Sequence, residues 1–232
     1  MEQFTQTAAM ALKGMGWVFL PAFLLPAVYL FCGSIWKLGG ISRALIRIID
    51  GFSYRSGEII KWALPALVVS IVFSIFALSI FGLTWTKLSE SADYFHAGVI
   101  MLGAAATLLA GQHVRVDIFH ARMTPKTRAL VDFSGFYLLL LPVCLVILWK
   151  SQSFTNFAWI ILEGSNEADG IRGRFLLKTL IPVFAVMMLM QGFAIALRAA
   201  LLLRGETLPE RPQKTPALFE DEPHKLMTET SS

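Results

Sequence analysis

The sequence predicts an all-α integral membrane protein. Of its 232 residues, 56% are hydrophobic and 16% are charged, and the charged residues cluster between long uncharged runs. A soluble domain carries about 25% charged residues and mixes them along the chain, so this composition leaves too few polar residues for a water-exposed surface. The runs are long enough to cross a bilayer as helices. The basic residues lie beside the runs, where topology and anionic headgroups explain them better than nucleic acid does; we expect a lipid bilayer as partner and no nucleic acid.

The N-terminal extension, residues 1–60, opens with an uncharged run from Gly14 to Trp36. As a helix this run would be about 34 Å long, which is enough to span. Pro21 and Pro26 lie inside it, and each proline removes a backbone donor. The run is therefore expected to be an extra hydrophobic helix that either spans with a kink or enters and leaves the same side. A signal peptide is disfavoured because no A-x-A-like cleavage site follows.

Residues 41–52 have the pattern of an amphipathic helix. Apolar side chains recur at helical spacing at Ile41, Leu45, Ile48, Ile49 and Phe52, while Arg43, Arg47 and Asp50 take the other face. This pattern predicts an interfacial helix whose apolar face enters the acyl boundary and whose polar face meets the headgroups. A soluble helix packed on another subunit is the alternative.

Residues 61–205 are expected to form a four-span domain. The predicted spans cover about 62–86, 92–112, 129–149 and 175–203. The first is the clearest, because 25 residues pass without a charge and Pro65 lies in the first turn, where proline is tolerated. After Gly205 the composition changes to Pro, Glu, Lys, Thr and Ser, so residues 206–232 are expected to be a disordered tail.

Two of the spans carry ladders of small residues at four-residue spacing. One ladder consists of Gly103, Thr107 and Gly111, and the other of Gly192, Ala196 and Ala200. Small side chains let another helix approach closely. Each ladder is therefore a candidate contact with a partner subunit or with a neighbouring span.

The loops predict the orientation in the membrane. Between the second and third of the four spans, the segment 112–128 holds four basic residues, Arg115, Arg122, Lys126 and Arg128, against the single acid Asp117. The positive-inside rule places this loop in the cytoplasm. The turn from Lys87 to Asp93 then lies outside, and the C-terminal tail returns to the cytoplasm.

The sequence shows no arrangement of residues typical of an enzyme. Asp93 and His96 lie at a membrane edge, where wet capping residues are common, and His96 and His113 are about 26 Å apart along one helix, too far to clamp one haem. Cys32 and Cys144 lack metal-ligand spacing. We expect no enzyme activity and no cofactor. The interiors of the spans carry almost no polar residues, and Gln191 is the main exception. Carriers that work alone usually have polar groups at mid-membrane, so such a carrier is also disfavoured.

One stretch resembles a known family. The segment MLGAAATLLAGQHVRVDIF, from Met101 to Phe119, closely resembles the small membrane subunit, the DctQ-like component, of tripartite ATP-independent periplasmic (TRAP) transporters. The HVRVDIF run is its most specific part. The similarity covers roughly residues 62–205, and it continues at Thr124-Pro125, Arg128 to Asp132, Leu141-Pro142, Trp159, Glu163 to Ser165, Leu176 to Pro182 and Gln191-Gly192.

The resemblance implies a small permease subunit in the bacterial inner membrane. It implies as partners a larger membrane subunit, which holds the substrate and sodium sites, and a periplasmic solute-binding protein that delivers an organic acid for uptake driven by an ion gradient. The closest likeness is to the branch labelled mannitol/chloroaromatic or 2-oxo acid type. His113, Arg115 and Asp117 are either a cytoplasmic clamp on the large subunit or a topology-setting loop. The alternative is an independent small carrier or the membrane anchor of another complex.

Overall fold

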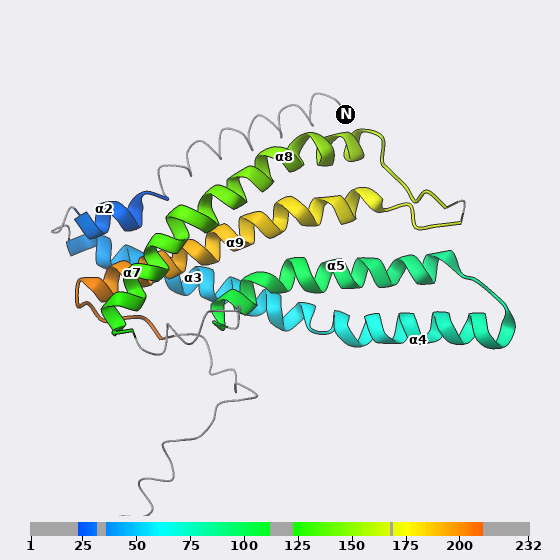
Figure 1. Ribbon diagram of the computed structural model, residues 1–232, viewed down its shortest axis with the longest axis horizontal. Coiled ribbons are helices and arrows are strands. Elements are labelled where there is room, and N and C mark those ends of the chain that lie inside the picture. The colour runs from blue at the N-terminus through cyan, green and yellow to red at the C-terminus, as the bar shows by residue number, and fades with distance from the viewer. Residues whose placement is uncertain (1–22, 32–35, 112–122, 168, 211–232) are drawn as a thin grey trace, which may run out of the picture.

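The computed structural model describes residues 23–31, 36–111, 123–167 and 169–210, and every regular element in these ranges is helical. Two long helical hairpins lie side by side (Figure 1). One consists of α4 (Ala63–Phe81) and α5 (Thr86–Leu109), and the other of α8 (Leu141–Ile160) and α9 (Arg174–Leu203). The loops of both hairpins lie at one end of the molecule, while α2 (Leu25–Phe31), α7 (Pro125–Gly135) and the end of α9 lie at the other. Four helical stretches are long and apolar enough to cross a membrane: Gly39–Phe81, Thr86–Leu109, Pro125–Ile160 and Arg174–Leu203.

The first described helices are α2 (Leu25–Phe31) and α3 (Trp36–Ile60). The helix α2 is part of the predicted run from Gly14 to Trp36, and it packs against α9. The rest of that run lies outside the described residues, so a span there stays a prediction. A short turn at Lys61 and Trp62 separates α3 from α4 (Ala63–Phe81).

The structure differs from the expected interfacial helix in the face that is buried. The buried face of α3 consists of Ser42, Ile46, Ile49, Asp50 and Ser53, whereas Ile41, Ile48 and Phe52 are exposed. Asp50 therefore does not point toward headgroups beside Arg47. The physical reason lies in α9, which presents polar side chains of its own that pair with Asp50, and a paired buried charge is tolerated where a lone one is not.

The helix α4 ends at Gly82, which has a left-handed φ of 62° and whose backbone N–H donates to the carbonyls of Ala77 and Leu78. Glycine adopts this conformation without steric cost, so it ends the helix and starts the turn. The helix α5 (Thr86–Leu109) follows at once. The expected outer turn at Lys87–Asp93 is therefore helical, and the turn itself lies at residues 82–85. Polar residues such as Lys and Glu are good helix formers, so the apolar run begins later than the helix does.

The third candidate span is longer than expected. It begins with α7 (Pro125–Gly135), where the Thr124 hydroxyl accepts from the Thr127 N–H at 3.3 Å and proline occupies the first turn. It continues through a π-helical segment, η1 (Phe136–Leu140), into α8 (Leu141–Ile160). The Leu141 N–H bonds to the Phe136 carbonyl, five residues back. This wider turn directly precedes Pro142, which lacks a donor and crowds the preceding turn of an α-helix.

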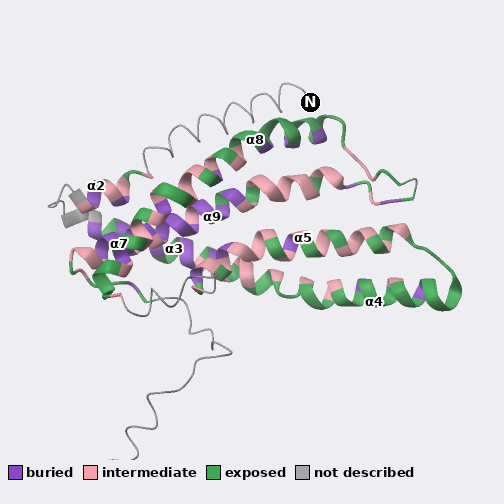
Figure 2. Cartoon of the chain, viewed as in Figure 1, coloured by how far each residue is buried: buried purple, intermediate pink, exposed green. Residues whose placement is uncertain are grey.

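The helix α9 (Arg174–Leu203) is the centre of the molecule. Its C-terminal half packs with α2, α3 and η1 into one apolar cluster that includes Ile46, Phe136, Phe193 and Leu197. A second cluster joins Cys144 of α8 to Ala185, Met188 and Leu189. Figure 2 shows the buried residues gathered along α9 and α3, while α4 is largely exposed. The predicted four long apolar helices are confirmed.

Candidate functional site

A buried charge network joins α3 to α9. The Asp50 side chain is 0% exposed, and its two oxygens bind different partners on α9. The Arg198 guanidinium forms an ion pair with Oδ2, and Gln191 Nε2 donates to Oδ1 at 3.0 Å. Removing charges from water is costly, and this cost is offset only when each charge has a close partner and further hydrogen bonds. The network therefore fixes how α3 lies along α9.

The chain after α9 ties three helices together. Residues 206–209, which we call the strap, follow Gly205, whose φ is 74°. The Arg198 guanidinium donates to the Pro209 carbonyl at 2.8 Å, and Arg43 of α3 donates to the Thr207 hydroxyl at 3.2 Å. The Tyr29 hydroxyl of α2 donates to the Glu206 carboxylate. The strap thus contacts α2, α3 and α9 and covers the edge of the charge network.

At the opposite end, Glu90 of α5 holds the loop between α8 and α9. Its carboxylate accepts hydrogen bonds from the Ser165 hydroxyl and from the Ile171 N–H, the latter at 2.6 Å. Gly170 is buried at this contact, and a Cβ at that position would overlap the Ser165 side chain. The Lys178 ammonium forms an ion pair with Glu163, and Trp159 Nε1 donates to the Thr179 hydroxyl at 2.8 Å. The loop is therefore held in place from both sides.

Small residues allow two close helix crossings inside the chain. A Cβ at Gly57 of α3 would lie 2.5 Å from Cβ of Ala106 on α5. A Cβ at Gly192 of α9 would overlap Leu140 and lie 2.9 Å from the Phe136 ring. Real Cβ atoms do not approach other atoms this closely, so both glycines are needed where these helices meet.

The candidate interface residues fall into three groups. Gly192, Ala196 and Ala200 are buried, and Gly192 faces Phe136 and Leu140 of the same chain. Gly103 lies near Ile60, Thr107 is exposed, and Gly111 has a φ of 70° in the turn after α5. His113, Arg115 and Asp117 lie outside the described residues. A contact of any of them with a partner subunit stays a prediction.

The sequence reasoning missed the pairing of Asp50 with α9. A signal for it exists, because Gln191 and Arg198 are seven residues apart and therefore lie on one face of a helix. It also missed Glu90, whose partners come from a loop 75 and 81 positions away. No local pattern contains that information.

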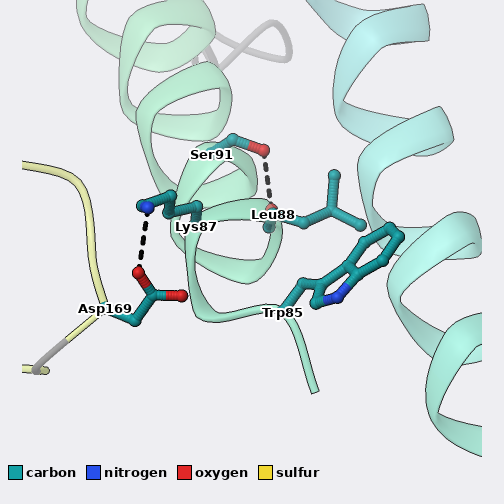
Figure 3. A pocket seen from close by; sticks show the side chains of 5 residues that line it. All are labelled: Trp85, Lys87, Leu88, Ser91 and Asp169. Carbon is teal, nitrogen blue, oxygen red and sulfur yellow. Dashed lines mark hydrogen bonds and ion pairs between the residues drawn. The ribbon is translucent and has the colours of Figure 1, made fainter. Parts of the chain in front are cut away.

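The helix α4 presents an apolar surface with a polar end. Within α4 only Ser70 and Ala77 are buried, and the helix packs mainly against α5. The Ser74 and Ser89 hydroxyls are 3.0 Å apart, and the Ser91 hydroxyl donates to Ser70 at 3.3 Å. These two contacts fix the register of the hairpin. At its tip, Trp85 and Leu88 lie beside the ion pair of Lys87 with Asp169 (Figure 3).

The chain matches the model of one protein family. The family model described as "Tripartite ATP-independent periplasmic transporters, DctQ component" matches residues 67–203, from the first turns of α4 to the end of α9. No curated protein and no solved structure matches this chain.

Proposed function

Because this chain belongs to the DctQ component family of the tripartite ATP-independent periplasmic transporters, we propose that it is the small permease subunit that braces a larger membrane subunit. The chain is a multi-pass membrane protein and a transporter component, not a member of an enzyme family. The family works in three-part systems. The family match carries this proposal, since it covers all four candidate spans in whole or in part.

A bracing role is supported by how the chain uses its polar groups. Gln191 and Arg198 both bind Asp50, so these side chains hold helices together and are not presented to a solute. The strap and the loop held by Glu90 fix the two ends of the molecule. A subunit with both ends held in this way suits a static support beside a partner that moves.

The orientation in the proposal places the hairpin loops in the periplasm. The two loops share one end of the molecule (Figure 1), and the basic segment 112–128 belongs to the other side by the positive-inside rule. The tail then lies in the cytoplasm of a bacterial cell, and the protein in its inner membrane. The loop held by Glu90 is the proposed docking surface for the solute-binding protein, because Glu90 binds it by two hydrogen bonds and because Glu167 and Asp169 are exposed.

The proposed cargo is an organic acid, taken up with an ion gradient. The substrate class and the mannitol/chloroaromatic or 2-oxo acid branch rest only on the family resemblance, which covers roughly residues 62–205. His113, Arg115 and Asp117 are proposed to contact the large subunit from the cytoplasmic side, together with the exposed Thr107 of α5.

Reconstitution tests this function directly. The chain is co-expressed with the large membrane subunit of its system, purified through a tag on this chain, and placed in liposomes with a sodium gradient. We expect copurification, and uptake of an organic acid only when both subunits and the loaded binding protein are present. Solute flux through liposomes that contain this chain alone would show an independent carrier and reject the proposal.

A further inference from the structure

Two hollows meet at the tip of the α4–α5 hairpin and share Trp85 as a common wall. The smaller hollow measures about 400 Å³ and is shown in Figure 3. Its surface is mostly apolar, and it is lined by Trp85, Lys87, Leu88, Ser91 and Asp169. The apolar hollow measures about 460 Å³, and its lining consists of Val68, Val69, Val72, Phe73, Phe76, Ala77, Phe81, Leu83 and Trp85. Together they form a mainly apolar site on the outside of the chain, with the ion pair of Lys87 and Asp169 at one end.

The apolar hollow has the dimensions of a lipid tail. Its lining runs along α4 from Val68 to Phe81, which is about 20 Å at the helical rise of 1.5 Å per residue. One leaflet of the hydrocarbon core is about 15 Å thick, half of the whole core. All the lining side chains are apolar, and the Phe73 ring stacks on Trp85 with the ring centroids 5.9 Å apart. The groove therefore fits one acyl chain that lies along the helix.

The smaller hollow carries one charge of each sign. Lys87 Nζ and Asp169 Oδ1 are 2.9 Å apart, and their side chains are 63% and 82% exposed. An exposed ion pair of this kind contributes little to stability, so its groups exchange partners at small cost. A headgroup with a phosphate and an ammonium complements both: the phosphate pairs with Lys87 and the ammonium with Asp169. Tryptophan favours the headgroup level of a membrane, where Trp85 would mark the boundary between the two hollows.

We propose that the two hollows form a binding site for one zwitterionic phospholipid with a primary ammonium, of the phosphatidylethanolamine type. One acyl chain lies in the groove of α4, and the headgroup lies between Lys87 and Asp169. Asp169 is also part of the proposed docking surface, but every residue that lines the site belongs to this chain. Lipid binding can therefore be measured without a partner subunit, and its failure would leave the proposed transport function standing.

Native mass spectrometry of the full chain, purified and stripped of lipid, tests headgroup choice. The protein is titrated with dioleoyl phosphatidylethanolamine, phosphatidylcholine and phosphatidylglycerol. We expect phosphatidylethanolamine to bind about tenfold more tightly than phosphatidylglycerol, which corresponds to about 1.4 kcal/mol. Phosphatidylcholine should bind with intermediate affinity, because its quaternary ammonium has no hydrogen to donate to Asp169. Equal binding of all three lipids means a non-specific lipid shell and overturns the proposal.

Substitutions then test each hollow separately. Asp169→Asn should make phosphatidylethanolamine bind no better than phosphatidylcholine, whereas Lys87→Met should weaken all three lipids. Val72→Trp fills the groove and should lower affinity at least about tenfold, while Ile71→Trp, exposed on α4 but outside the groove, is the matched control. Circular dichroism shows whether each variant folds, and Val69→Trp replaces Val72→Trp if that variant does not. Equal affinity of the groove variant and its control overturns the site.

Discussion

Asp50 and Arg198 lie 148 positions apart in the chain, and they meet away from water. Either residue read alone predicts a contact with headgroups, because charged side chains next to apolar runs commonly reach the interface. Whether these charges meet headgroups or each other depends on how α3 is rotated against α9, and no local spacing in the sequence determines that rotation. Gln191 is the useful clue, since a polar side chain inside an apolar helix requires a hydrogen-bond partner.

The charge network should respond differently to one substitution than to two. Asp50→Leu leaves Arg198 without its counter-ion and should lower the free energy of unfolding by roughly 3–5 kcal/mol. The double variant Asp50→Leu with Arg198→Leu removes both charges and should recover much of that loss. Thermal unfolding in detergent, followed by circular dichroism, measures the difference. If the double variant is less stable than Asp50→Leu, the ion pair is not what joins α3 to α9.

Two glycines of α3 provide a matched pair. At Gly51 nothing lies within 4 Å of a new Cβ, so Gly51→Ala should stabilise the helix by up to about 1 kcal/mol. At Gly57 the same change meets Cβ of Ala106, which cannot rotate away, so Gly57→Ala should destabilise the chain by roughly 1–3 kcal/mol. The same unfolding experiment compares them. Equal effects of the two changes would mean that α3 does not cross α5 closely at Gly57.

At the scale of the helices, hydropathy predicts the apolar middle of each span but does not predict the residues at which the helix begins and ends. The last span was expected at 175–203 and is found at Arg174–Leu203, because apolar residues fill almost the whole helix. The second of the four spans begins six residues before its expected start at 92, and α8 continues past Trp149 to Ile160. In both places polar residues extend the helix beyond the apolar run. Lys87 and Glu90 of α5 bind the loop between α8 and α9, whereas the Ser151 hydroxyl of α8 donates to the Leu148 carbonyl of its own helix.

That loop should loosen when Glu90 loses its charge. Glu90→Gln keeps the size of the side chain but weakens the bonds from the Ser165 hydroxyl and the Ile171 N–H, because a carboxylate accepts more strongly than an amide does. Hydrogen exchange at Ile171 should become faster. Asp93→Asn, an exposed change one turn along α5, should leave that rate unchanged. Unaltered exchange in Glu90→Gln would show that the loop is held by other contacts.

For the molecule as a whole, the family match begins at residue 67, yet the folded unit begins earlier. The helix α3 lies before the match and contacts both α5 and α9. The sequence predicted residues 1–60 as an extension, because nothing in composition shows that α3 shares a core with the spans. The strap likewise lies in what was predicted to be the start of a disordered tail at residue 206, since its proline and threonine are typical of tails.

Two truncations test the strap. A chain that ends at Gly205 loses the contacts with Tyr29, Arg43 and Arg198, and it should unfold at a lower temperature than the full chain. A chain that ends at Glu210 retains them and should unfold like the full chain. Thermal unfolding of the two truncated proteins in the same detergent gives the comparison. Matching midpoints would show that the strap does not stabilise the helices.

Every described helix except α4 packs against α9, and α9 is the last of these helices in the chain. During synthesis, the earlier helices therefore leave the ribosome before their common neighbour exists. Asp50 must wait without its counter-ion until nearly 150 further residues have been translated. Membrane-insertion factors that bind a polar helix at the translocation site would be needed most in that interval. Slow translation of the residues between α3 and α9 would lengthen the time that α3 spends without α9.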